Sequence, residues 1–299
     1  MASKGAGLTT AIACASGSIR GVFVHGVLAG LEQAGFRADA YAASSSSAVP
    51  AAFAAIGEIG ALSSIRYWKT ACERYKAHGN SMSEAILDGL TVICPLLAEK
   101  LFTASAARYV VVTSEVVNKE TAAQTQGDGA RRLGQRLVIS TRRKDRGWAD
   151  ANLATRLFDN RSSDPDFLLR PDDLADVLYA TTRMLHAWRV PAWIRGRPHI
   201  DASYACSCPA VELAELGYDR IIAVLPEPGT PFRDFFQASV VPDSWKGRSI
   251  QLVQPDAGLG QWGVDYMSAT DEGLERAFAH GLAKGHELAT SSPRQTGSA

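Results

Sequence analysis

Four consecutive serines, at positions 44 to 47, join an apolar segment to an Ala-rich one, and no other feature constrains the fold as strongly. Residues 38–42 have the composition of a short buried strand, and residues 48–53 that of a helix. A strand that passes through a tight turn of small residues into a helix holds one side chain exposed above the helix N-terminus. The serines also suit an N-cap cluster, because serine hydroxyls accept hydrogen bonds from the first N–H groups of a helix.

The preceding residues have the same alternation of strand and helix. Residues 8–14 have the pattern of a buried strand, residues 15–21 that of a tight loop, and the following helix runs to Ala34, with Gly35 placed to end it. Such alternation predicts a parallel sheet covered by helices. We therefore expect a three-layer α/β/α fold, with a mainly parallel central sheet, over residues 8–289 as a single α/β domain. Residues 1–7 and 290–299 have no apolar periodicity and are expected to be flexible.

The rest of the chain has a less regular pattern. Residues 59–123 have mainly helical spacing, although the β-branched run at 110–113 also suits a strand. Residues 124–132 have the composition of an exposed connection, residues 136–141 that of a strand, and residues 142–146 that of a charged turn, which we interpret as solvated rather than as an anion site. Further helices are expected from Pro171 to before Pro191 and over residues 209–216 and 270–289, and further strands over residues 198–200, 220–225 and 249–253.

Composition excludes several classes of function. The 31 basic and 31 acidic residues cancel, so no global charge attracts nucleic acid or an anionic membrane, and any contact with a membrane would be weak, local and peripheral. No phosphate-binding loop, dinucleotide fingerprint or basic-aromatic patch is present. The five cysteines are scattered, no segment has the pattern of a signal peptide or membrane span, and Cys206-x-Cys208 lacks a second ligand pair. These features predict a cytoplasmic protein without metal or cofactor, and they leave the oligomeric state open.

Three separated motifs share an order and context with one known family. They are Ser16-Gly17-Ser18-Ile19-Arg20-Gly21 after the first strand, the serine turn, and Ile200-Asp201-Ala202-Ser203. Together they resemble the patatin-like phospholipase family, whose members carry a Gly-Gly-Gly-x-Arg-Gly oxyanion loop, a Gly-x-Ser-x-Gly elbow and an Asp-Gly-Gly or Asp-Gly-Ala turn. The resemblance covers most of the chain and is weakest over residues 59–134. It implies a serine acyl hydrolase of lipid metabolism, with esterase or lipase-like activity on a small acyl ester or lipid-like substrate.

The resemblance assigns Ser45 as the nucleophile and Asp201 as its base. A serine hydroxyl attacks a carbonyl only when a base takes its proton, and a carboxylate at hydrogen-bonding distance suffices without a histidine. The product of the attack would be an acyl-enzyme. Ser44 and Ser46 remain candidates, because the register within the serine run depends on matching the helix that follows.

The first motif is assigned as the oxyanion hole. The amides of Gly17, Ser18 and Ile19, at the start of a helix, would hold the negative oxygen of the tetrahedral intermediate. Arg20 would stiffen this loop or add positive potential, and an ordinary surface role for it is as common.

The chain departs from the family at six glycine or small-residue positions: Ser16, Ser18, Ala43, Ser47, Ala202 and Ser203. Each replacement keeps its backbone N–H, but the added Cβ atoms narrow the substrate space and are tolerated best where φ is negative. The same dyad would also serve an acyltransferase or cyclase, and the lost glycines also suit a catalytically silent relative that binds an acyl or lipid-like ligand.

Two further candidates depend on side chains outside these motifs. A Ser-His-Asp site would need a late histidine, either His280 or His286, although a histidine on a helix face is more often a surface residue.

Trp188 and Trp193 flank Pro191 and are candidates for the wall of an acyl pocket, although packing in the core is the more common role.

Overall fold

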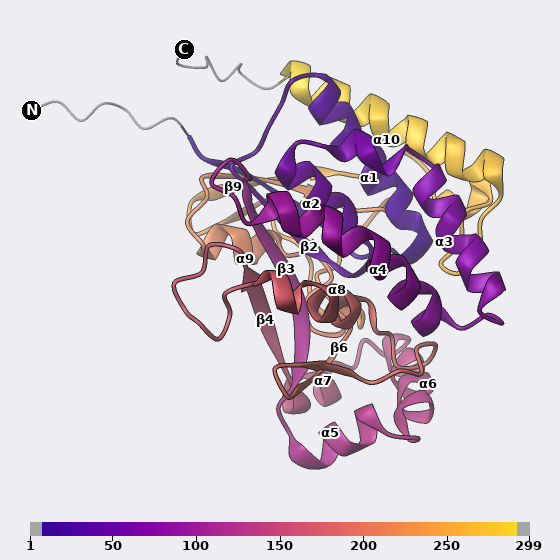
Figure 1. Cartoon of the computed structure of the whole chain (residues 1–299). Coiled ribbons are helices and arrows are strands. Elements are labelled where there is room, and N and C mark those ends of the chain that lie inside the picture. Colours follow the sequence, from indigo (N-terminus) through magenta and orange to yellow (C-terminus); the bar gives the residue numbers. More distant parts are fainter. Residues whose placement is uncertain (1–7, 292–299) are drawn as a thin grey trace, which may run out of the picture.

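The computed structural model describes residues 8–291, and its named strands form one nine-stranded sheet (Figure 1). In chain order the strands are β1 (Thr10–Cys14), β2 (Ala40–Ser44), β3 (Arg108–Val116), β4 (Leu153–Asp159), β5 (Ala192–Ile194), β6 (Arg197–Ile200), β7 (Arg220–Val224), β8 (Ser244–Trp245) and β9 (Arg248–Val253). The helices are α1 (Gly21–Gln33), α2 (Ala48–Ile56), α3 (Arg66–Ala77), α4 (Met82–Leu101), α5 (Lys119–Gln126), α6 (Ala130–Thr141), α7 (Gly147–Asn152), α8 (Leu174–Thr182), α9 (Ala210–Glu215) and α10 (Asp271–Ser291).

The centre of the sheet is parallel, as the alternation of strands and helices predicted. Across the sheet the order is β5-β6-β3-β2-β1-β7-β9-β8, with β4 paired to β3 outside this path. The pairs among β3, β2, β1, β7 and β9 are parallel, whereas β4, β5, β6 and β8 pair antiparallel at the margins. Because parallel strands end at the same edge, the loops that follow β1 and β2 open side by side.

Both faces of the sheet are buried, which confirms the three-layer α/β/α fold. Ile12 and Cys14 of β1 pack with α1, α2 and α10 on one face, while Ala11 and Ala13 pack with α9 on the other. Alternate residues of a strand point to opposite faces, so one short apolar strand serves two cores. Figure 1 shows α1, α2 and α10 together on the first face.

α1 and α10 approach each other through glycines spaced four residues apart on each helix. A methyl group added at Gly26 would lie 2.3 Å from the Phe278 carbonyl oxygen, and one added at Gly281 would lie 2.3 Å from the Phe23 carbonyl oxygen. Gly30 and Gly285 repeat the arrangement one turn further along. The two backbones are therefore closer than any pair of helices with side chains at these positions would allow.

The prediction of a strand over residues 136–141 is wrong, because they lie in α6. Val138 and Ile139 are β-branched and suggested a strand, but Ala130, Leu133 and Leu137 recur at helical spacing and are buried in one cluster. Gly134 faces the backbone of residues 185–186, and an added methyl group there would lie 2.3 Å from the His186 amide nitrogen. Tertiary packing therefore outweighs β propensity here.

Other predicted boundaries also change. Residues 110–113, for which the sequence left a helix and a strand open, lie in β3. Residues 124–132 are largely helical rather than an exposed connection. The helix predicted to run from Pro171 to before Pro191 ends at Thr182, after which the buried Arg183 side chain donates to the carbonyls of Thr125 and Val190. β4 and β5 were not predicted. Residues 1–7, which we expected to be flexible, lie outside the described residues, as do residues 292–299 of the predicted tail. Thr290 and Ser291, also assigned to that tail, belong to α10.

Candidate active site

The serine run forms a sharp turn between β2 and α2. Residues Ser45–Ser47 make a single 3₁₀ turn, and Ser45 has φ +56°, in the left-handed region. We expected Ala and Ser to be tolerated best at negative φ, so this conformation differs from the expectation. A non-glycine residue in this region costs roughly 1–2 kcal/mol and needs support from its surroundings.

That support comes from α8 and β3. The Ser45 N–H donates to Thr181 Oγ1 at 2.8 Å, and the Thr181 hydroxyl donates in turn to the Val112 carbonyl at 2.6 Å. Thr181 is fully buried, so it links the turn to the centre of the sheet. The tight turn aims the Ser45 side chain away from the helix axis and into a cavity.

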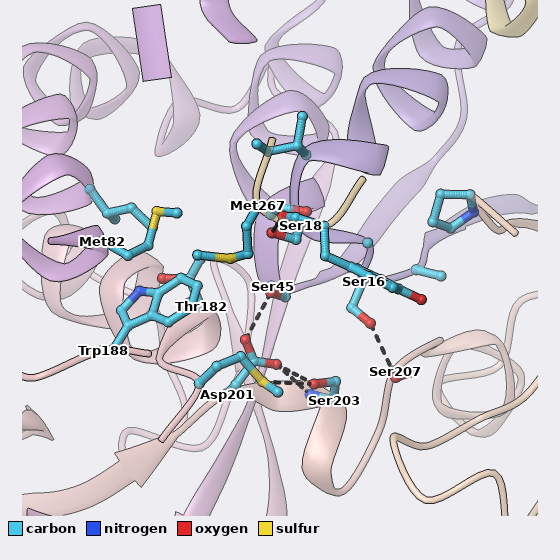
Figure 2. A pocket seen from close by; sticks show the side chains of 18 of the residues that line it. Ser16, Ser18, Ser45, Met82, Thr182, Trp188, Asp201, Ser203, Ser207 and Met267 are labelled. Carbon is cyan, nitrogen blue, oxygen red and sulfur yellow. Dashed lines mark hydrogen bonds between the residues drawn. The ribbon is translucent and has the colours of Figure 1, made fainter. Parts of the chain in front are cut away.

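The four serine hydroxyls have different surroundings. The Ser44 hydroxyl donates to the Cys206 carbonyl at 2.9 Å, and the Ser47 hydroxyl donates to the Ala15 carbonyl at 2.6 Å. The Ser46 hydroxyl has no hydrogen-bond partner within the described residues. Only Ser45 faces a carboxylate, with Oγ donating to Asp201 Oδ2 at 2.8 Å (Figure 2). The sequence left open whether Ser44, Ser45 or Ser46 faces Asp201, and in the structure it is Ser45.

Asp201 is held rigidly after β6. Its Oδ1 atom accepts hydrogen bonds from the Ser203 amide at 2.8 Å and the Ser203 hydroxyl at 2.6 Å, which leaves Oδ2 directed at Ser45 (Figure 2). Complete burial raises the pKa of Asp201 from its ordinary value of 3.8 to about 6, while the hydrogen bonds from Ser203 and Ser45 oppose the rise. Asp201 is therefore mainly ionised at pH 7 yet basic enough to accept a proton.

The loop after β1 lies against the serine turn. Of the three amides predicted as an oxyanion hole, that of Ile19 donates to the Tyr266 carbonyl at 3.4 Å. The Ser18 hydroxyl donates to the same carbonyl, which fixes its side chain away from its own amide. The amides of Gly17 and Ser18 have no acceptor among the described residues, and both residues line the cavity beside Ser45. Gly17 and Ser18 are thus the two donors that remain for an oxyanion.

The Arg20 side chain is bound by neighbouring groups and does not extend freely into solvent. Its guanidinium donates to Glu227 and, through Nε at 3.2 Å, to the Val264 carbonyl, and it lies 4.1 Å from the centre of the Tyr266 ring. These contacts tie the loop after β1 to the segment that carries Val264 and Tyr266.

Ser45 and Asp201 open into a cavity of about 570 Å³. Figure 2 shows Met82 and Trp188 on one side of the pair, and Ser16 and Ser207 on the other. The first side is apolar and is formed largely by α3, α4 and α8, whose lining residues include Ala71, Cys72, Met82, Ile86, Leu90, Ile93 and Leu178. The volume is in the range of pockets that hold drug-sized or acyl ligands.

Of the remaining candidates from the sequence, only Trp188 lies at the cavity. Trp188 lines the cavity, whereas Trp193 is 46% exposed on β5 and does not. His280 and His286 lie on α10 outside the cavity lining, and His280 Nε2 accepts from the Asp256 amide at 3.2 Å. The partner of Ser45 is a carboxylate, so a Ser-His-Asp site with either histidine is not formed.

Sequence reasoning missed three residues of the site. Thr181 and Ser203 hold the two members of the pair, and His186 lines the cavity with a pKa lowered by burial. Ser203 stood in the motif but was considered only as a lost glycine. Nothing in the sequence marked Thr181, because its contact with Ser45 joins segments more than 100 residues apart. Nothing marked His186, because its position at the cavity depends on the path of the chain after α8.

No protein-family model matches the chain, and no curated protein matches it.

Within residues 8–291, no group of three or more His, Cys, Asp or Glu side chains is arranged to hold a metal ion. None of the helices in this range has the length and apolar character needed to cross a bilayer. The site must therefore be interpreted from its own geometry.

Proposed function

We propose that this chain is a patatin-like serine acyl hydrolase that cleaves an ester through a Ser45–Asp201 dyad. The observation that carries the proposal is the 2.8 Å hydrogen bond from Ser45 Oγ to Asp201 Oδ2, made by a serine at positive φ in an apolar cavity. Serines with ordinary structural roles donate to backbone carbonyls, as Ser44 and Ser47 do. A hydroxyl paired with a buried carboxylate of raised pKa is the arrangement that general base catalysis requires.

The proposed mechanism needs no group beyond the dyad and two amides. Asp201 takes the Ser45 proton as Oγ attacks the ester carbonyl, and the amides of Gly17 and Ser18 stabilise the oxyanion. Collapse of this intermediate breaks the bond to the alcohol, which leaves with the proton from Asp201. Asp201 then takes a proton from the water that attacks the acyl-enzyme. As the bond between the acyl carbon and Oγ breaks, Asp201 returns this proton to Ser45 Oγ and the acid is released.

The shape of the cavity supports an apolar acyl group as the part that is bound. The side formed by α3, α4 and α8 carries aliphatic side chains together with Trp188, whereas the Ser16 and Ser207 side is polar. An acyl chain would lie on the first side and the alcohol on the second.

We place the protein in the cytoplasm, because its five cysteines are unpaired.

The test of this function is the identity of a covalent adduct. After incubation with a fluorophosphonate, mass spectrometry is expected to find the phosphonyl group on the peptide that contains Ser45. Turnover of a p-nitrophenyl ester with release of free acid distinguishes hydrolysis from transfer to an amine or alcohol acceptor. Absence of both labelling and turnover would reject the enzyme and favour the silent acyl-binding relative.

Ser203→Ala is expected to move the acidic limb of the rate profile. The Ser203 hydroxyl donates to Asp201 at 2.6 Å and stabilises the ionised carboxylate, so its removal raises the pKa of Asp201. We expect kcat/KM to fall with decreasing pH through about 6 in the parent chain, and the midpoint to rise by about one pH unit in the variant. Ser207→Ala is the matched control, because Ser207 lines the cavity without contacting Asp201. Equal midpoints in all three proteins would refute the role of Ser203.

Asp201→Asn is expected to gain stability relative to the parent chain as pH rises. The folded pKa of about 6 exceeds the ordinary 3.8, so the folded state binds this proton more tightly. The parent chain has the full contribution of Asp201 below pH 3.8 and loses it as pH rises through about 6. Over this range the free energy of unfolding of the parent chain therefore falls by about 3 kcal/mol. Urea unfolding of both proteins at pH 4 and pH 7.5 measures the change in their difference, and a difference independent of pH would contradict the raised pKa.

A further inference from the structure

A concentration of positive charge surrounds α6. Residues 131–146 contain seven basic side chains and one acidic side chain, Asp145, although the whole chain has a net charge of zero. The basic residues are Arg131, Arg132, Arg136, Arg142, Arg143, Lys144 and Arg146. Residues 136–141 were predicted as a strand and residues 142–146 as a solvated turn, whereas residues 130–141 form α6, which gives the segment a different distribution of charge.

The charges lie on one side of the helix. Ala130, Leu133, Gly134 and Leu137 are buried against the protein, whereas Arg131, Arg132, Gln135 and Arg136 between them are exposed. We define the basic face as Arg131, Arg132, Arg136 and Ile139 of α6 together with Arg142 and Arg143 of the turn that follows it, all of which are exposed. The four helical positions fall within one half of the helical circumference. None of these arginine side chains has a hydrogen bond or ion pair among residues 8–291. The five guanidinium groups are therefore available to a partner.

Stability of the fold does not account for this arrangement. Arg131 and Arg132 stand in the first turn of α6, at the positive end of the helix dipole, and no acidic residue stands in that turn. Positive charges there repel the dipole and one another. Surface arginines with a structural role are paired, as Arg146 is with Asp150 and Asp234.

The basic face also carries an exposed apolar side chain and adjoins the catalytic cavity. Ile139 is 56% exposed between the arginines. Val138 and Thr141 of α6 line the cavity that contains Ser45, and the Lys144 ammonium lies 5.5 Å from the ring centre of Phe232, which also lines it. One helix thus presents positive charge outward and an apolar edge to the cavity.

We propose that the basic face of α6 docks the protein on the surface of an anionic lipid bilayer, with the cavity beside the membrane. Arginines near such a surface are attracted to lipid phosphates, and an exposed isoleucine gains by entering the headgroup region. Single-stranded nucleic acid is a poorer match, because its binding sites place aromatic side chains for base stacking and the basic face has none. The proposal concerns binding alone and does not require the catalytic activity.

The test is sedimentation with vesicles of phosphatidylcholine, with and without phosphatidylglycerol. Binding is expected only with phosphatidylglycerol, weakening as salt increases. The triple variant Arg132→Gln/Arg136→Gln/Arg143→Gln should bind on the order of 100-fold more weakly. The control Arg220→Gln/Lys246→Gln/Arg248→Gln removes three positive charges at the β7–β9–β8 edge, and Figure 1 shows β9 far from α6.

The outcomes separate this proposal from the catalytic one. Ser45→Ala should bind the vesicles as the parent chain does, whether or not the parent chain has esterase activity. No binding to either vesicle, or equal losses in the two triple variants, would overturn the docking site. Tighter binding of the parent chain to an oligonucleotide than to the anionic vesicles at the same salt concentration would assign the basic face to nucleic acid instead.

Discussion

Replacing Ser45 by alanine is expected to lower kcat/KM for a p-nitrophenyl ester on the order of 10⁴-fold or more and to abolish fluorophosphonate labelling. Alanine removes the only serine hydroxyl of the turn that faces Asp201. Asp201→Asn leaves the hydroxyl but removes the base, and general base catalysis contributes roughly 10²–10⁴-fold. Because the two groups act together, the double variant should be no slower than Ser45→Ala.

Ser46→Ala is the matched control for this loss. It also removes one hydroxyl from the serine turn, but Ser46 Oγ has no hydrogen-bond partner within the described residues. We expect its rate to stay within a few-fold of the parent chain, because the substitution breaks no hydrogen bond. A loss as large in Ser46→Ala as in Ser45→Ala would contradict the assignment of the nucleophile.

Gly281→Ala is expected to destabilise the fold by about 3 kcal/mol or more, measured as the free energy of unfolding in urea. The added methyl group would lie 2.3 Å from the Phe23 carbonyl oxygen and 3.0 Å from the Val27 amide nitrogen. Both are backbone atoms of α1, so no side chain rotation relieves the overlap and the two helices must separate. Separation would also expose apolar contacts between α1, α10 and the sheet.

Gly89→Ala tests the same substitution without the overlap. Gly89 is buried in α4, but a methyl group there meets only Arg74 Nη1, at 3.5 Å, an ordinary contact. Alanine has the higher helix propensity, so this variant should be as stable as the parent chain or more stable by about 0.5–1 kcal/mol. Similar destabilisation by both substitutions would mean that the close approach of α1 and α10 is not its cause.

The fold class was predictable because the parallel strands have a simple sequence pattern. Residues 8–14, 220–225 and 249–253 are short apolar runs between turn residues, and each corresponds to a strand of the sheet. The error over residues 136–141 has a physical origin: two β-branched residues suggested a strand, while three buried residues at helical spacing and the backbone contact at Gly134 stabilise a helix. Because residues 130–141 form the helix α6, Arg131, Arg132 and Arg136 lie on its exposed side.

The site was predictable in part. Motif order indicated the pairing of a serine near residue 45 with Asp201, and the hydrogen bond between Ser45 and Asp201 is present. The choice among four serines was not available from the sequence, since it depends on the backbone turn at Ser45 and on carbonyls that engage Ser44 and Ser47. For the oxyanion loop, the Tyr266 carbonyl removes one of three predicted donors.

The amino-acid sequence alone determined the alternation of strands and helices and the types of residue available for chemistry, because periodicity and composition are properties of neighbouring residues. Tertiary structure alone decided which serine meets the carboxylate, what pKa that carboxylate has, and on which side α6 carries its charge. These properties depend on burial and on contacts between segments far apart in the chain, such as Ser45 and Asp201, 156 residues apart, and no local pattern encodes such contacts.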